Sequence, residues 1–168
     1  MQQSPALSAQ DLEALAAALS RTAVPDEPHP MLRSLDGITQ RAVGHRLFTA
    51  LRYDLDAGLA YRLYSSAPSL YPATGTKEIA TAPALRNMVE NGRPLLTPDA
   101  DAVRQNFPDA DAIFSLGCAS ILNIPVYGQG RLLGQINLLH EENHFTAAQI
   151  PFCTGLAVLA ALAFLPSA

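Results

Sequence analysis

The feature that most constrains the fold is a pair of apolar segments on either side of Gly128-Gln129-Gly130. Residues Ala119–Tyr127 (ASILNIPVY) and Arg131–His140 (RLLGQINLLH) are rich in Ile, Leu and Val, and a short glycine-containing loop between two such runs predicts a β-hairpin. Their apolar character is continuous, which indicates burial on both faces. We therefore expect this hairpin at the centre of an antiparallel sheet that is covered on both sides.

A second hairpin precedes it in the chain. Residues Arg46–Asp54 and Leu59–Ser65 have the pattern of strands, and Leu55–Gly58 has the length of a hairpin loop. We expect this hairpin to join the same sheet. The segment between the two hairpins has a mixed pattern that predicts short elements. These are helices over Pro83–Asn91, Asp99–Phe107 and Asp109–Leu116, and a strand over Arg93–Thr97.

The N-terminal residues predict a helix with one apolar face. Ser8 and Asp11 have the spacing of a capping box, which begins a helix. The apolar stripe that follows consists of Leu12, Leu15 and Leu19. The prolines of Pro25–Pro30 cannot continue a helix, so this stretch ends it.

Two further helices are predicted in the rest of the chain. One runs from about Pro30 to Val43, and the last begins at Thr146, which forms a capping box with Gln149. From Leu156 to Leu165 the last helix is apolar on all sides, so it must be covered all round. The predicted units are an N-terminal helix with a proline-rich linker over residues 1–28 and a single globular domain over residues 29–168.

Composition excludes several classes of protein. The chain is 49% hydrophobic and 15% charged, which suits a packed core and argues against disorder. Its net charge is −4 and its basic residues are scattered, so we expect no nucleic-acid partner. The N-terminus lacks the positive segment of a signal peptide, and the apolar run Phe152–Leu165 is too short to span a bilayer. We expect free thiols at Cys118 and Cys153, a cytoplasmic location and no membrane partner.

The C-terminal third resembles the GAF domain family. The residues that carry the resemblance are Ser120-Ile121-Leu122-Asn123-Ile124-Pro125-Val126, Gly128, Leu133-Gly134-Gln135-Ile136-Asn137-Leu138 and Phe145-Thr146. They are similar to the family pattern of a strand ending in proline, a glycine turn, a second strand with an early glycine, and a last helix that begins with Phe and Ser or Thr. The resemblance implies an α+β fold, GAF/PAS-like, with a central antiparallel β-sheet, terminal helices on one face and a ligand pocket with short helices on the other.

The same register assigns candidate ligand-binding residues. Asn123, Gln135 and Asn137 should share one sheet face, where carboxamides can donate to and accept from a neutral polar ligand such as an amino-acid-like or heterocyclic group. The alternative is that they bind loop backbone or buried water. The full set of candidates is Thr49, Tyr53, Tyr64, Tyr71, Phe114, Ile121, Asn123, Gln135 and Asn137. Arg62 and Arg86 are either contacts for an anionic ligand or solvated surface residues.

Other chemistries find less support in the sequence, and we expect no cofactor, no metal and no catalytic residue. His140, Glu141, Glu142 and His144 fall at a strand end and in a loop, where the two histidines would share a face only if the segment were helical. The residues of the cyclic-nucleotide and bilin-binding members do not match here. Free methionine sulfoxide reductases, which are GAF-like thiol enzymes, have loop cysteines, but Cys118 has no second cysteine near it in sequence.

The sequence therefore predicts a sensory or regulatory domain that binds a small molecule. Two alternatives remain, which are a thiol enzyme similar to free methionine sulfoxide reductase and a structural interaction domain with a collapsed pocket. Because the last helix is apolar all round, we also expect a homodimer joined through the terminal helices. The signal would then pass through the dimer or through a separate partner.

Overall fold

The computed structural model describes residues 5–21, 24–26 and 29–165, and within these ranges six strands form one antiparallel sheet. The strand order is β3-β2-β1-β6-β5-β4. The strands are β1 (Leu47–Asp54), β2 (Leu59–Ser65), β3 (Thr76–Glu78), β4 (Leu95–Thr97), β5 (Ser120–Gly128) and β6 (Arg131–His140). Strand β6 lies between β1 and β5, so the predicted central position of the hairpin formed by β5 and β6 is confirmed. The short strand β3 was not predicted.

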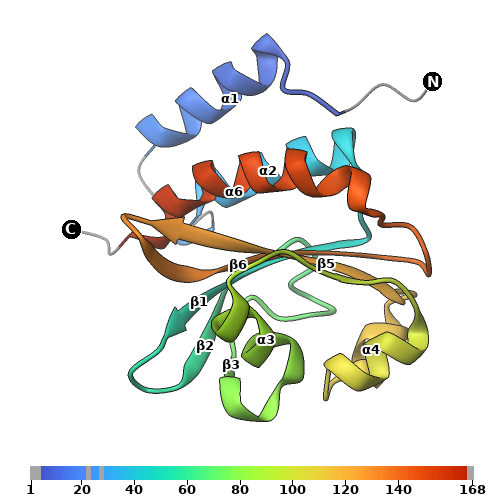
Figure 1. The fold of residues 1–168 in the computed structure, drawn as a ribbon. Coiled ribbons are helices and arrows are strands. Elements are labelled where there is room, and N and C mark those ends of the chain that lie inside the picture. The colour runs from blue at the N-terminus through green and yellow to red at the C-terminus, as the bar shows by residue number, and fades with distance from the viewer. Residues whose placement is uncertain (1–4, 22–23, 27–28, 166–168) are drawn as a thin grey trace.

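Helices cover both faces of the sheet (Figure 1). On one face lie α1 (Ala9–Ser20), α2 (Pro30–Ala42) and α6 (Ile150–Ala160). On the other lie α3 (Pro83–Asn91), α4 (Ala100–Asn106) and α5 (Ala110–Ser115). Three short 3₁₀ turns are also described: η1 (Ile79–Thr81) precedes α3, η2 (Ala147–Gln149) precedes α6, and η3 (Ala161–Phe164) follows α6. This arrangement confirms the predicted α+β class, with terminal helices on one face and short helices on the other.

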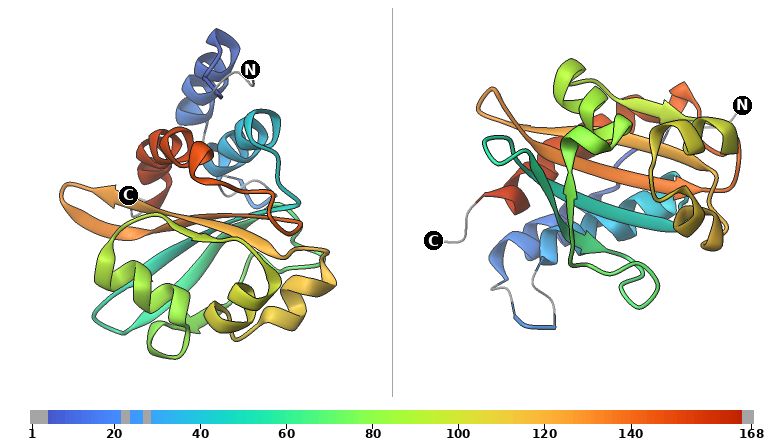
Figure 2. Two further views of the ribbon diagram at one scale, coloured as in Figure 1. Left: turned by 45° about the vertical axis from the view of Figure 1, so that its right-hand side comes forward. Right: turned by 90° about the horizontal axis from the view of Figure 1, so that it is seen from below.

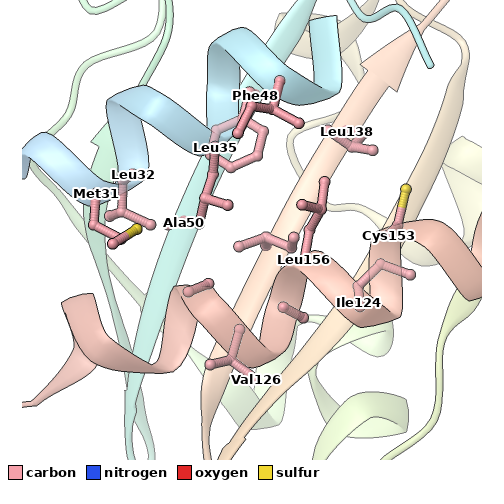
Figure 3. Close-up of a cluster of buried hydrophobic side chains, with 14 of the residues drawn as sticks. Met31, Leu32, Leu35, Phe48, Ala50, Ile124, Val126, Leu138, Cys153 and Leu156 are labelled. Carbon is pink, nitrogen blue, oxygen red and sulfur yellow. The ribbon is translucent and has the colours of Figure 1, made fainter. Parts of the chain in front are cut away.

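The main hydrophobic core lies between the sheet and the pair α2 and α6 (Figure 3). Phe48 and Leu138 from the sheet, Leu35 from α2 and Leu156 from α6 are each at most 1% exposed. Successive strand residues point to opposite faces, so Phe48 and Ala50 on this side leave Thr49 and Leu51 on the other. That alternation decides which side chains of β1 can reach a pocket.

Helix α1 has the predicted start, and one residue of its apolar stripe is buried within the chain. The capping box of Ser8 and Asp11 is present. Leu15 is 4% exposed and packs into the main core, whereas Leu12 and Leu19 are 54% and 58% exposed. Helix α1 contacts α2, and its buried residues are Asp11, Leu15 and Ala18. Figure 2 shows α1 standing away from the sheet above the other two helices. Residues 1–4, 22–23 and 27–28 of the predicted N-terminal unit lie outside the described residues.

The last helix begins as predicted. Thr146 and Gln149 form the capping box, η2 follows, and α6 proper begins at Ile150 with Pro151 in its first turn. A proline is tolerated there because the first amides of a helix have no partner within it. Val158 and Leu162 are exposed on the outer side of this C-terminal segment. In the part of the chain that the structure places, no helix is both long and apolar enough to cross a membrane.

Gly134 is required where β6 meets β1. A Cβ atom at this position would lie 2.0 Å from the carbonyl oxygen of Leu51 and 2.7 Å from the ring of Phe164. Both contacts are far shorter than a real Cβ atom makes. This close approach lets η3 lie against the sheet next to the central strands.

Candidate functional site

One row of polar side chains crosses the face of the sheet that is turned toward α3, α4 and α5. Thr49 of β1 pairs with Asn137 of β6, which in turn pairs with Asn123 of β5. Gln135 lies two residues from Asn137 and so points to the same face. All four side chains are at most 5% exposed. The observed strand register therefore places these residues on one face of adjacent strands, as the sequence predicts.

These side chains form a connected hydrogen-bond network. Asn123 Nδ2 donates to Asn137 Oδ1 over 2.6 Å, and Gln135 Nε2 donates to the same oxygen. Asn137 Nδ2 donates to Thr49 Oγ1 over 2.9 Å. At the other end, the hydroxyl of Tyr53 donates to Gln135 Oε1. Burial raises the pKa of Tyr53 above its ordinary value, so this hydroxyl is a proton donor at all physiological pH values.

One acceptor of the network has no partner. Asn123 Oδ1 is buried and receives no hydrogen bond from the described residues. A buried acceptor that has lost its water without gaining a partner costs about 1–3 kcal/mol. Asn123 Oδ1 can therefore accept a hydrogen bond from a group that reaches it.

The network borders a small cavity of about 40 Å³. That volume holds only a few water molecules. Its lining combines the polar row with apolar side chains from the sheet and from the segments around α3, α4 and α5. The lining residues are Thr49, Leu51, Arg62, Tyr71, Lys77, Ala82, Ala84, Leu85, Phe107, Pro108, Ile113, Ile121, Asn123, Gln135, Asn137 and Leu139.

Three charged residues and Tyr71, from four segments of the chain, meet at one side of this cavity. Lys77 Nζ of β3 lies 2.7 Å from Asp109 Oδ2, and the hydroxyl of Tyr71 donates to the same carboxylate oxygen over 2.7 Å. The guanidinium carbon of Arg62 on β2 lies 4.0 Å from the centroid of the Tyr71 ring. The Lys77 and Asp109 side chains are each 26% exposed, so the group lies at the boundary between the cavity and solvent.

The carboxylate and the phenol in this group have opposite pKa shifts. Burial alone would raise the pKa of Asp109, but the charge of Lys77 and the hydrogen bonds from Lys77 and Tyr71 keep it below its ordinary value. Burial and the nearby Asp109 carboxylate raise the pKa of Tyr71. Asp109 is therefore ionised and Tyr71 protonated at neutral pH, which preserves these hydrogen bonds.

Most of the predicted site residues lie in or beside the cavity. Thr49, Tyr71, Ile121, Asn123, Gln135 and Asn137 line it. Tyr53 lies behind the network and contacts it through Gln135. Arg62, which the sequence offers as a contact for an anionic ligand, also lines it, as do Leu51 and Leu139. Arg86 is exposed and does not line the cavity.

Tyr64 was predicted as a wall of the pocket, and the structure places it on the opposite face. Ala50 pairs with Tyr64 while Leu51 pairs with Arg62, so Leu63 is an extra residue in a β-bulge. A bulge reverses the alternation of the strand beyond it. Tyr64 therefore packs on Phe48, and its hydroxyl donates to Asp36 Oδ2 of α2 over 2.7 Å.

Phe114 was also predicted as a wall and does not line the cavity. The neighbouring residue on α5, Ile113, points into the cavity instead. Phe114 is partly buried beside α4, where the guanidinium carbon of Arg104 lies 5.0 Å from its ring centroid. On a helix of two turns, a shift of one residue is enough to turn a side chain away from the site.

Lys77 and Asp109 are cavity-side residues that sequence reasoning missed. Lys77 lies on β3, a strand of three residues without an apolar pattern, and no periodicity identifies it. Asp109 has the position of a helix N-cap, but its side chain caps nothing and bonds to Lys77 and Tyr71 instead. Only the tertiary structure brings these residues together.

The cysteines are poorly placed for thiol chemistry. Cys118 is 1% exposed, and burial raises its pKa to about 11. Cys153 is fully buried in the main core on the other face of the sheet, with a pKa of about 12. Both thiols are therefore protonated at neutral pH, and the sheet separates them.

His140 and His144 come together although their segment is not helical. Their rings stack with centroids 3.6 Å apart, which corrects the expectation that only a helix would bring them onto one face. A tight turn in which Asn143 has a φ of 59° folds His144 back onto the end of β6. Over the residues that the structure describes, no group of three or more His, Cys, Asp or Glu side chains is arranged to hold a metal ion.

Comparison with known proteins agrees with this architecture. The family model for the GAF domain matches residues 8–164. Among solved structures, the GAF domain of an Acinetobacter phosphoenolpyruvate-protein phosphotransferase is 14% identical with a TM-score of 0.67, covering 94% of each chain. A GAF/HD domain protein from Geobacter sulfurreducens is 16% identical with a TM-score of 0.66, covering 79% of this chain and 88% of that one.

A third similar structure is the free methionine-R-sulfoxide reductase from Neisseria meningitidis in complex with its substrate. It is 14% identical with a TM-score of 0.66, covering 95% of this chain and 92% of that one. No curated protein matches the sequence. At these identities the structural likenesses establish the fold, and the match over residues 8–164 establishes the family. This chain belongs to the GAF domain family.

Proposed function

We propose that this GAF domain is a sensory or regulatory module that binds a small polar molecule between its sheet and the helices α3, α4 and α5. The observation that carries the proposal is the buried network of Asn123, Gln135, Asn137 and Thr49 beside a cavity, with Asn123 Oδ1 unpaired. Buried polar groups normally have partners. A ligand that donates a hydrogen bond to Asn123 would complete the network.

Carboxamides also favour a particular kind of ligand head group. Each NH₂ group has two donor hydrogens, and the network uses one from each of Asn123, Gln135 and Asn137. The remaining hydrogens and the free Asn123 oxygen together suit a neutral group with both donors and acceptors, such as an amide or a heterocycle. The apolar lining from Leu51, Leu85 and Ile121 would cover the rest of it.

A structural interaction domain with a collapsed pocket is the second candidate. It is favoured by the cavity volume of about 40 Å³, which is well below the roughly 300 Å³ of typical ligand pockets. Under the ligand-binding proposal, the segments around α4 and α5 move outward when the ligand enters. The thiol-enzyme alternative has less support, because both thiols are buried with raised pKa values.

We further propose that the domain acts as a homodimer through its terminal helices. Leu12 and Leu19 on α1 are exposed, as are Val158 on α6 and Leu162 in η3. Burying a side chain of this size contributes about 1.5–3 kcal/mol before the cost of association. If a second copy covers these helices, the signal of ligand binding would pass through the dimer.

Native mass spectrometry of gently purified protein tests the ligand-binding proposal. We expect a small-molecule mass in addition to the 17.9 kDa chain. Asn137→Leu should weaken its retention by about 5- to 150-fold, because the loss of one buried hydrogen-bond partner costs about 1–3 kcal/mol. Leu138→Ala is the matched control, since Leu138 is the next residue of β6 and packs on the opposite face.

One result would favour the interaction domain instead, namely a bare chain mass for the wild type together with the absence of any stabilising compound in a ligand screen. Equal retention by the wild type and Asn137→Leu would contradict the proposed site, because it would place the ligand outside this cavity.

A further inference from the structure

We propose that the ligand of this pocket is an elongated small acid, with an anionic group that Arg62 binds at the cavity boundary and a neutral hydrogen-bond donor that reaches Asn123. This inference rests on the proposed function and specifies the chemical class of the ligand. It depends on two polar atoms at opposite ends of the lining that are buried and lack partners.

The first of these atoms is Nε of Arg62. Arg62 lines the cavity, and its Nε is buried without a hydrogen-bond partner. Its Nη1 donates to the backbone oxygens of Pro72 and Thr74 over 2.8 and 3.4 Å, which holds the guanidinium over the Tyr71 ring. In the described part of the chain no carboxylate forms an ion pair with Arg62. A fixed guanidinium with a free Nε matches the two oxygens of a carboxylate.

The charges around Arg62 leave one positive charge in excess. Lys77 is paired with Asp109 at 2.7 Å, and the lowered pKa of Asp109 keeps that pair ionised. Arg62 is the additional cation of this group. A ligand with a single negative charge would neutralise it, whereas a cationic ligand would meet Arg62 and Lys77 together.

The second atom is Oδ1 of Asn123, which accepts hydrogen bonds and cannot donate them. It therefore excludes a second carboxylate at that end and requires an N–H or O–H group. Asn123 is 1% exposed, so a group that reaches it loses its contact with water. This loss costs less free energy for a neutral group than for a charged one. An amide NH₂ group meets both conditions.

The sheet register sets the separation between the two groups. Arg62 lies on β2 and Asn123 on β5, with β1 and β6 between them. Three strand spacings amount to about 14 Å between backbones, and the two side chains cover part of this distance. The carboxylate and ammonium groups of a simple α-amino acid share one carbon and are too close to reach both ends. An acid with a terminal amide about four to six carbons away fits better.

A matched set of probes tests this inference. Glutaramate has a carboxylate and a terminal amide, glutaramide lacks the charge, and pentanoate lacks the amide; adipamate extends the chain by one carbon. Calorimetric titration of the wild-type protein should show glutaramate or adipamate binding at least tenfold more tightly than both glutaramide and pentanoate.

Variants assign each end of the ligand. In Arg62→Gln, glutaramate should no longer bind more tightly than glutaramide, and Arg62→Lys should retain part of this difference in affinity. In Asn123→Leu, glutaramate should no longer bind more tightly than pentanoate. Arg86→Gln removes an exposed arginine that does not line the cavity, and it should behave as wild type. Thermal unfolding of each variant identifies any that fails to fold.

The outcomes separate this inference from the proposed function. Equal binding of glutaramide and glutaramate would overturn the anionic group and leave a small-molecule site intact. A preference for glutaramate over glutaramide that persists in Arg62→Gln would also overturn the role of Arg62. If none of these probes binds while native mass spectrometry shows another retained molecule, the inferred class is wrong and the proposed function stands.

Discussion

At the scale of single residues, this domain depends on side chains that differ sharply from their neighbours on the same strand. Asn123 and Asn137 are carboxamides set between Leu122, Ile124, Ile136 and Leu138, all of which are fully buried on the opposite face. Each hydrogen bond that a carboxamide in such a position does not make costs free energy. The unpaired Asn123 Oδ1 is therefore the residue-level feature from which binding is inferred.

Gly134 gives a residue-scale prediction about the fold alone. We expect Gly134→Ala to lower the free energy of unfolding by about 1–3 kcal/mol, because the new Cβ would overlap the Leu51 carbonyl oxygen and the Phe164 ring. Urea denaturation measures the change. Gly155→Ala is the control, because Gly155 is exposed on α6, has open space around its Cβ and has an ordinary helical backbone, so the change adds a methyl group without a clash. Equal stability of Gly134→Ala and wild type would show that β6 and β1 are farther apart than described.

At the scale of elements, the sequence predicts those features that are determined by the local spacing of apolar residues. The hairpin β5–β6 is identified because its apolar residues are continuous, and its parity places Asn123, Gln135 and Asn137 on one face. Tyr64 escapes this reasoning, because the bulge at Leu63 reflects pairing between strands and leaves no mark in the sequence. The exposure of Leu12 and Leu19 likewise depends on where α2 lies. The spacing of the apolar residues in α1 gives no information about that position.

The bulge gives a prediction for β2. Tyr64→Phe should lower the free energy of unfolding by about 0.5–1.5 kcal/mol, since the hydrogen bond to Asp36 is lost, and should leave ligand affinity unchanged. Tyr71→Phe removes an equivalent hydroxyl that bonds to Asp109 beside the cavity, and it should change ligand affinity. Chemical denaturation and titration of a bound ligand measure the two effects. Altered ligand affinity in Tyr64→Phe would place that side chain back in the pocket.

At the scale of the whole molecule, the three-layer arrangement separates the proposed binding layer from the proposed association layer. The cavity lies between the sheet and α3, α4 and α5. The helices α1 and α6, which with η3 carry the exposed apolar residues, lie on the other side of the sheet, and Figure 2 shows the helices of the two sides. The central strands β1, β6 and β5 contribute side chains to both layers. A change in the pocket would therefore reach the terminal helices through the packing of these strands.

Sedimentation at micromolar concentration tests the association layer. We expect a dimer of about twice the 17.9 kDa chain mass, and Val158→Glu should convert it to a monomer by burying an unpaired charge. Leu70→Glu is the control, because Leu70 is 70% exposed and Val158 is 69% exposed, but Leu70 lies in the β2–β3 connection. A monomeric wild type would contradict the dimer, and a dimer that persists in Val158→Glu would place the interface elsewhere.

The central claim is that the cavity beside Asn123 is a ligand site, and a thermal-unfolding screen against metabolite-sized compounds tests it most directly. The screen compares the wild type with Asn123→Leu and with Leu138→Ala, whose altered residue packs on the opposite face. We predict that at least one compound raises the unfolding temperature of the wild type and of Leu138→Ala but not that of Asn123→Leu. Compounds that stabilise all three proteins equally, or a screen in which none stabilises the wild type, would contradict the claim.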